Sequence, residues 1–170
     1  MDTGWKAILW SQFGAAIDML ERAIVACPER VWSDRTRRHQ FWYVAFHTAF
    51  WLDCYLAESE EAYRPPAPFD RGELEADWRP ERVYTKAEVL ELLRHGRENC
   101  RARIDGLSEG CASERSGFDY RDMTVAELIV YNLRHVQHHA AQLNLILRET
   151  VDSVPQWVSK VGRGAPGPVG

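Results

Sequence analysis

The hydrophobic positions of the chain fall into four long segments, in which apolar residues recur mostly at steps of three and four. This spacing is typical of one face of an α-helix. We expect helices over about 5–27, 40–58, 85–104 and 124–150, with Pro28 ending the first. No segment of useful length alternates polar and apolar residues, so the pattern indicates an all-α protein. Four long helices in one small domain predict a four-helix bundle.

Two of the helix starts carry a specific signal. The third segment begins with "TKAE" and the fourth with "TVAE". In each, a threonine at the cap precedes a glutamate by three residues, so that each side chain can bond the other's backbone N–H. Thr85 with Glu88 and Thr124 with Glu127 are therefore predicted capping boxes.

The second segment, "QFWYVAFHTAFWLDCYLAE", is apolar on nearly every side. Such a helix lies deep in a core or in an interface. Its apolar residues opposite His47 include Phe41, Ala45, Leu52 and Leu56, more than a thin bundle is expected to cover. We therefore expect a homodimer that buries part of this helix or a neighbouring one.

The connections between the predicted helices are unequal. Residues 60–84 contain four prolines and exceed the ~12–15 residues usual for a loop without structure of its own. Aromatic residues in this link favour packing over the bundle. Residues 106–123 form a second long link. We expect one domain over residues 1–160 and a disordered tail over 161–170, "VGRGAPGPVG".

Composition narrows the function classes. The chain has 170 residues, 45% of them hydrophobic, and a formal net charge of -4, which argues against a nucleic-acid binder with a basic face. No apolar run approaches the ~20 residues of a membrane span, and the N-terminus lacks the apolar region of a signal peptide. We expect a cytoplasmic protein whose four cysteines, none in a CxxC pair, are free thiols.

The fourth segment concentrates histidine, with three of the six histidines in "HVQHH". At 100° per residue, His139 and Asn132 fall inside the apolar stripe, His135 at its edge and His138 outside it. His135 and His139 are four residues apart and share a face, so both can bind one divalent ion.

A metal site usually needs a third ligand, and the apolar second segment offers His47. A buried histidine is costly without a partner, which a metal or a hydrogen bond supplies. The alternative is a hydrogen-bonded packing histidine without a metal. We expect the two remaining histidines, His39 and His95, to be exposed.

Four further residues are candidate hydrogen-bond partners of the ligand histidines, because a metal-bound imidazole usually donates its other N–H. Helix geometry selects Asn132, Gln142, Tyr43 and Glu58. Plain packing or solvation is the alternative for each of them. The sequence assigns no catalytic acid or base.

The segment "HVQHHAAQL", with one histidine in an apolar second helix, resembles the DinB/YfiT-like metal-binding proteins over roughly residues 5–150. The resemblance implies an up-down-down-up four-helix bundle, often dimeric. It also implies a zinc or nickel ion held by His47, His135 and His139. Members with known activity largely use thiols such as bacillithiol, and mycothiol-dependent maleylpyruvate isomerases are relatives.

Three histidines leave a coordination position open, which is typical of catalytic zinc. On the family resemblance we expect transfer of a low-molecular-weight thiol to an electrophilic small molecule. One alternative is a hydrolase that uses metal-activated water. Another is a non-catalytic metal-binding dimeric bundle, for which Cys54 is the candidate fourth ligand.

Overall fold

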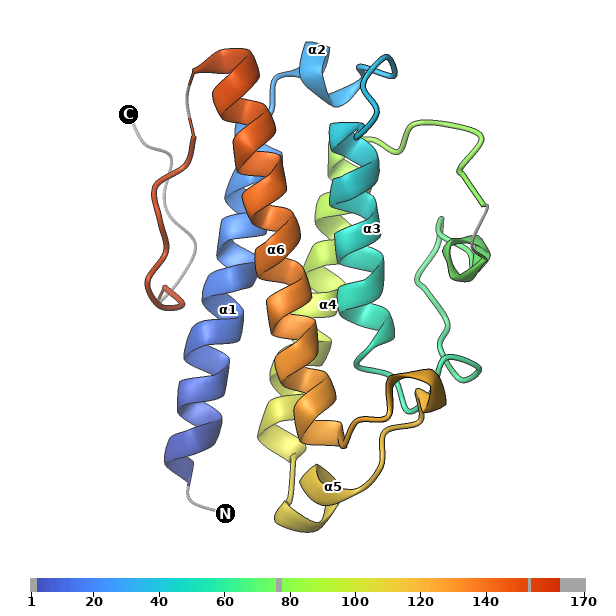
Figure 1. Cartoon of the computed structure of the whole chain (residues 1–170), viewed down its shortest axis with the longest axis vertical. Coiled ribbons are helices and arrows are strands. Elements are labelled where there is room, and N and C mark those ends of the chain that lie inside the picture. The colour runs from blue at the N-terminus through green and yellow to red at the C-terminus, as the bar shows by residue number, and fades with distance from the viewer. Residues whose placement is uncertain (1–2, 76–77, 153, 163–170) are drawn as a thin grey trace.

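The computed structural model describes residues 3–75, 78–152 and 154–162 and is built from helices (Figure 1). Four long helices are joined by shorter helical turns. The long helices are α1 (Thr3–Ala26), α3 (Phe41–Cys54), α4 (Lys86–Gly106) and α6 (Val125–Val151), and the short ones are α2 (Glu29–Trp32), η1 (Gly72–Leu74), α5 (Glu109–Ser113) and η2 (Asp119–Arg121). The predicted all-α class is confirmed.

The four long helices form a bundle in which each packs against two others. In Figure 1, α1 runs upward, α3 and α4 run downward, and α6 runs upward again. Helix α3 packs against α4 and α6, and α1 packs against the same two helices from the other side. This is the expected up-down-down-up order, and it places α3 and α6 side by side with opposite directions.

Both predicted capping boxes are present. The Thr85 side chain accepts from the backbone of Glu88 at the start of α4, and the glutamate accepts in return. Thr124 and Glu127 do the same at the start of α6. These caps fix where α4 and α6 begin, because they satisfy N–H groups that have no partner within the helix.

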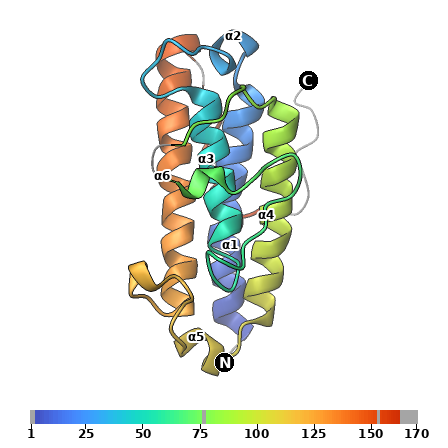
Figure 2. The ribbon, with the colours of Figure 1, turned by 90° about the vertical axis from the view of Figure 1, so that its right-hand side faces the viewer.

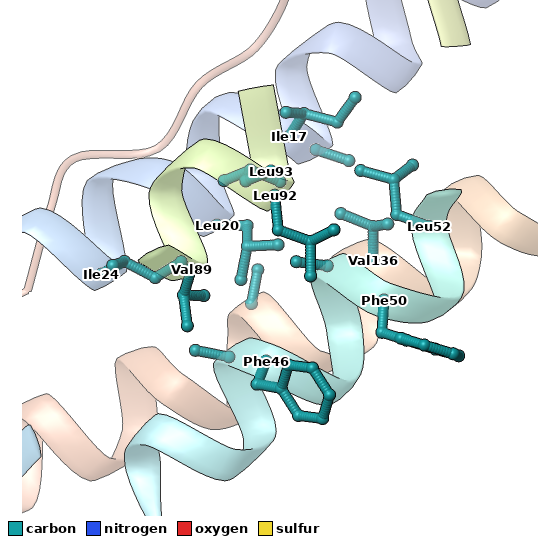
Figure 3. Close-up of a cluster of buried hydrophobic side chains, with 14 of the residues drawn as sticks. Ile17, Leu20, Ile24, Phe46, Phe50, Leu52, Val89, Leu92, Leu93 and Val136 are labelled. Carbon is teal, nitrogen blue, oxygen red and sulfur yellow. The ribbon is translucent and has the colours of Figure 1, made fainter. Parts of the chain in front are cut away.

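The core lies between the four long helices and draws on all of them (Figure 3). Ile17 and Leu20 of α1 meet Leu92 of α4 and Val136 of α6 there, and all four side chains are fully buried. The apolar residues of α3 are buried within this single chain as well. Phe41, Ala45 and Leu52 are 0% exposed and Leu56 is 9% exposed. We expected that a single bundle would leave part of α3 uncovered, and this was wrong. The homodimer that we expected for that reason stays a prediction.

The link between α3 and α4 packs on the bundle, as its aromatic residues predicted. Figure 2 shows the link and η1 crossing in front of α3, between α6 and α4. Phe69 stacks on Phe46 of α3 with ring centroids 5.6 Å apart, and Tyr84 lies 4.8 Å from both rings. Burial of these rings removes apolar surface from water and holds the link in place.

Helix α3 is shorter than the predicted segment at its C-terminal end, where it stops at Cys54 rather than near Glu58. The chain then turns toward the second link, and Ser59 forms an isolated bridge with Gly117. A Cβ at Gly117 would lie 2.1 Å from the carbonyl oxygen of Glu58, so only glycine permits this approach.

Most of the predicted tail, residues 163–170, lies outside the described residues. Val161, the first residue of the predicted tail, donates its backbone N–H to the carbonyl oxygen of Ser11 in α1 at 2.9 Å. All four cysteines are free thiols, as expected. Within the described residues, no helix combines the length and apolar character that a membrane crossing requires.

Candidate metal centre

Three histidines from two antiparallel helices meet at one side of the bundle. His47 comes from α3, and His135 and His139 come from successive turns of α6. The ring centroid of His47 lies 5.4 Å from that of His135 and 5.0 Å from that of His139, and the two α6 rings are 4.6 Å apart. The residues that the sequence selected as metal ligands are therefore brought together.

The spacing of their nitrogens suits one metal ion. A candidate ligand nitrogen from each ring lies within 4.8 Å of the other two. Nε2 of His47 and Nε2 of His135 are 3.4 Å apart. Two nitrogens that each lie about 2.1 Å from a tetrahedral zinc ion are about 3.4 Å from one another, so this pair needs little rearrangement to share an ion. The three histidines could hold a metal ion.

The other ring nitrogen of His47 has a strong partner. Its Nδ1 lies 2.6 Å from Oε1 of Glu73, which is buried in η1. A carboxylate can only accept, so Nδ1 carries the proton and Nε2 keeps its lone pair free for a metal. Glu73 also accepts from the hydroxyl of Tyr43 at 3.0 Å, which fixes the carboxylate in turn.

His139 is oriented in the same way by a neighbour on α6. Its Nδ1 lies 2.7 Å from Oε1 of Gln142. The amide oxygen accepts, so the proton is again on Nδ1 and Nε2 is left as the metal-binding atom. The amide nitrogen of Gln142 lies 3.1 Å from Nε2 of the exposed His138, which ties this histidine to the set without making it a candidate ligand.

His135 differs from the other two, because its Nδ1 is buried and has no hydrogen-bond partner among the described residues. Its ring packs edge-on to Tyr55, with centroids 6.2 Å apart. The hydroxyl of Tyr55 accepts from the guanidinium of Arg121 at 2.7 Å. Packing therefore holds the Nδ1 side of His135, while its Nε2 lies 3.4 Å from Nε2 of His47.

Burial favours the neutral forms of His135 and His139. The pKa of His135 is lowered to about 3, chiefly by burial and to a smaller extent by the neighbouring His139 and His47. Burial likewise lowers the pKa of His139 to about 4, against the opposing hydrogen bond from Gln142. Because a metal competes with protons for imidazole nitrogens, lowered pKa values suit a ligand role.

The four predicted hydrogen-bond partners have different surroundings. Gln142 contacts a histidine directly, and Tyr43 contacts Glu73. Asn132 is fully buried and donates to the backbone carbonyl of Leu52 at 2.9 Å, so this hydrogen bond ties α6 to α3. Glu58 lies beyond the end of α3 and is exposed. Its selection rested on a helix that does not extend that far.

Sequence reasoning missed Glu73, the strongest partner in the group. It lies in the proline-containing link, 26 residues from His47, where no helical spacing relates the two. The expectation that the link packs over the bundle was the only available signal, and it does not say which of the link's acidic residues faces inward.

Cys54 is not a member of the histidine group. It is buried, and burial raises the pKa of its thiol, which disfavours the thiolate that a metal would need. Among the described residues, the set of metal-binding side chains is therefore three histidines without a fourth ligand.

A cavity of about 780 Å³ opens beside the histidines. His47 and His139 are part of its wall, while His135 lies deeper. The remaining walls come from four segments: the loop before α3, α3 itself, the link around η1, and α6, which contributes Gln142. They are formed by Arg35, Arg38, His39, Gln40, Trp42, Tyr43, Val44, Trp51, Glu73, Leu74, Glu75, Arg79, Pro80 and Gln142.

A second polar cluster lies on the α3–α4 side and corrects the prediction for His95. Asp53 is 3% exposed and accepts from Asn99 at 2.8 Å and from Tyr63 at 3.1 Å. Nε2 of His95 lies 3.6 Å from the same carboxylate, and its side chain is only 40% exposed. His95 is therefore half-buried beside the buried Asp53 rather than fully exposed, whereas His39 is exposed as expected.

The comparison with protein families agrees with this architecture. The model of the DinB superfamily matches residues 12–143, which include His47, His135 and His139. No curated protein and no solved structure matches the chain significantly. Since the family model covers most of the chain, the protein belongs to the DinB superfamily.

Proposed function

We propose that this protein is a metal-dependent enzyme that transfers a low-molecular-weight thiol to an electrophilic small molecule. The observation that carries the proposal is the convergence of His47, His135 and His139 at the wall of an open cavity. Three imidazole ligands without a fourth protein ligand would leave room for a substrate atom, which is the arrangement of catalytic rather than structural sites. Imidazole donors suit zinc or nickel.

A divalent ion at this position would lower the pKa of a bound thiol and hold the thiolate for attack. Other residues of the chain orient the imidazole rings. Glu73 and Gln142 fix two of the imidazole rings, with Nε2 directed at the common point. Burial of His135 lowers its pKa and favours the neutral imidazole, which has a lone pair to offer to a metal.

In the reaction that we propose, sulfur forms a bond to the electrophilic carbon while the leaving group departs with its electron pair. The thiol proton leaves to solvent through the open side of the cavity. Tyr43 is unsuited to accept that proton, because burial and the charge of Glu73 raise the pKa of its hydroxyl and keep it protonated.

The carboxylates of the cavity support thiol transfer over attack by water. Hydrolysis usually benefits from a carboxylate that can accept a proton from water. Glu73 already accepts from both Tyr43 and His47, and the other carboxylate of the wall, Glu75, is exposed. A thiol needs such a base less, because its pKa of about 8.5 is close to neutrality before any metal binds.

The test compares metal-loaded protein with a His135→Ala variant. Bacillithiol, mycothiol, glutathione and coenzyme A are each offered with 1-chloro-2,4-dinitrobenzene, and release of chloride is followed. We expect turnover with at least one thiol in the metal-loaded protein and none above background in the variant. Equal rates in both, or hydrolysis of esters or amides in place of thiol transfer, would contradict the proposal.

A further inference from the structure

The cavity beside the histidines carries an unusual concentration of arginine. Arg35 and Arg38 come from the loop that precedes α3, and Arg79 comes from the link after η1. Three separate positions in the sequence thus bring guanidinium groups to one cavity, in a chain whose formal net charge is -4.

Two of these arginines have no side-chain partner within the part of the chain that the structure describes. The side chains of Arg35 and Arg38 make neither an ion pair nor a hydrogen bond with any residue that the structure describes, although Arg37 between them pairs with Asp34 at 3.5 Å. Arg79 donates to the backbone carbonyl of Trp78 and lies 4.7 Å from the centre of the Tyr43 ring. The guanidinium groups are therefore available to a ligand.

Negative charge in the cavity does not cancel them. Glu73 and Glu75 are the carboxylates among the described lining residues. Glu73 is 7% exposed and accepts from His47 and Tyr43, which leaves it little capacity to pair with an arginine. Of the described lining residues, only Glu75 is then left to offset three guanidinium groups, so this lining attracts anions.

The wall between the arginines and the histidines is aromatic. Trp42, Tyr43 and Trp51 contribute to it, and the ring of Trp51 lies 6.4 Å from that of His47. His47 follows Gln40, at the end of the arginine loop, by seven residues of helix, or about 10 Å along its axis at 1.5 Å per residue. The cavity thus offers a cationic end, an aromatic middle and a histidine end.

From this arrangement we infer that the electrophilic substrate carries an anionic group, a carboxylate or a phosphate, on an apolar or aromatic body. Arg35 and Arg38 bind the anionic group, and the electrophilic carbon lies toward the histidine end of the cavity, beside His47 and His139. That the bound anion is the substrate rests on the proposed function. Binding of an anion to the arginines does not require a metal.

Direct binding to metal-free protein tests the inference independently of catalysis. The probes are 4-phenylbutanoate, phenyl phosphate and the neutral 4-phenylbutanamide, followed by calorimetry and by quenching of tryptophan fluorescence. We expect an acid to bind at least about tenfold more tightly than the amide, since charge-assisted hydrogen bonds are the stronger ones. The preference should weaken as salt is raised.

Variants of the cavity arginines test whether they cause the preference for the acid over the amide. Arg35→Gln combined with Arg38→Gln should remove most of the preference for the acid, and Arg79→Gln should reduce it. Arg148→Gln is the matched control, because this arginine is exposed on α6 and lies outside the cavity. Equal binding of acid and amide, no binding of either acid, or equal losses in the double variant and the control would overturn the inference.

The two proposals can fail separately. If the acids bind through the arginines but the protein takes up no zinc or nickel, the anion site stands and the metal-dependent function falls. If metal binds through the histidines while acids show no preference over the amide, the inferred substrate class falls and the metal site stands.

Discussion

Glu73 and His47 are joined by a contact of 2.6 Å between a carboxylate oxygen and Nδ1, and Glu73 belongs to the link rather than to the bundle. Carboxylates in this position raise the basicity of a ligand histidine and fix its orientation. The link is thereby part of the candidate metal centre as well as a cover for α3.

We therefore predict that Glu73→Gln lowers affinity for zinc or nickel by about 10–100-fold. The amide oxygen can still accept from Nδ1, but it lacks the charge that strengthens the bond. Competition with a chromophoric chelator gives the affinity. Glu75→Gln, a change to the exposed glutamate nearby, is the control and should bind metal like the wild type.

The ligand set predicts which histidines are needed for binding. Alanine at His47, His135 or His139 should each abolish stoichiometric metal binding, because two imidazoles alone make a weak site. Alanine at His138 should preserve it, since this histidine is exposed, contacts Gln142 and is not a member of the group of three histidines. Elemental analysis of purified variants decides the matter, and loss of metal from His138→Ala with retention in His135→Ala would show that the assignment is wrong.

The lowered pKa values of the α6 histidines predict how stability depends on pH. In the folded protein the pKa values of His135 and His139 are about 3 and about 4, below the ~6.5 of an exposed imidazole. Between those values the unfolded chain binds more protons than the folded one, so the free energy of unfolding of metal-free protein decreases as pH falls through this window.

Urea unfolding at about pH 7 and about pH 5 measures that decrease. Carboxylates titrate in part of the same range, so the comparison is made with a His135→Ala/His139→Ala variant. The loss of stability on acidification should be larger in the wild type. Parallel pH curves for the two proteins would mean that these imidazoles are not neutral through burial.

The Asp53 network makes a prediction about stability alone. Asp53→Ala should lower the free energy of unfolding by about 3 kcal/mol, because Asn99, Tyr63 and His95 all lose their common acceptor. Tyr63→Phe removes one of these bonds and should cost about 1 kcal/mol. The control, Asp105→Ala, removes an exposed ion pair with Arg101 and should change stability by less than about 1 kcal/mol. Metal affinity should not change in any of the three variants.

Much of the fold was predictable because local signals are strong in the long helices. Apolar spacing predicted all four, and the threonine–glutamate boxes predicted where α4 and α6 begin. The C-terminal end of α3 was not predictable, because it stops at Cys54 to let the following residues approach Gly117 of a distant link. That approach is a tertiary contact, which no local pattern records.

The candidate site likewise has residues that were predictable from the sequence and residues that were not. His135 and His139 share a helix, so their relation follows from helix geometry, and His47 was inferred from the cost of burying a histidine. Glu73 and the Asp53–His95 contact depend on how a link and two helices pack, and sequence spacing does not determine this. The arginines of the cavity belong to the same class, because they come from two different loops.

The candidate metal ligands belong to the bundle, whereas part of the cavity wall belongs to the link. Metal binding and substrate preference therefore depend on different segments of the chain. The bundle sets which atoms can hold a metal, through His47, His135 and His139. The link, with Glu73 and Arg79, sets the electronic character of His47 and part of the cavity wall. Grafting a different segment between α3 and α4 would thus offer protein engineers a way to alter reactivity and substrate preference while the metal-holding scaffold remains intact.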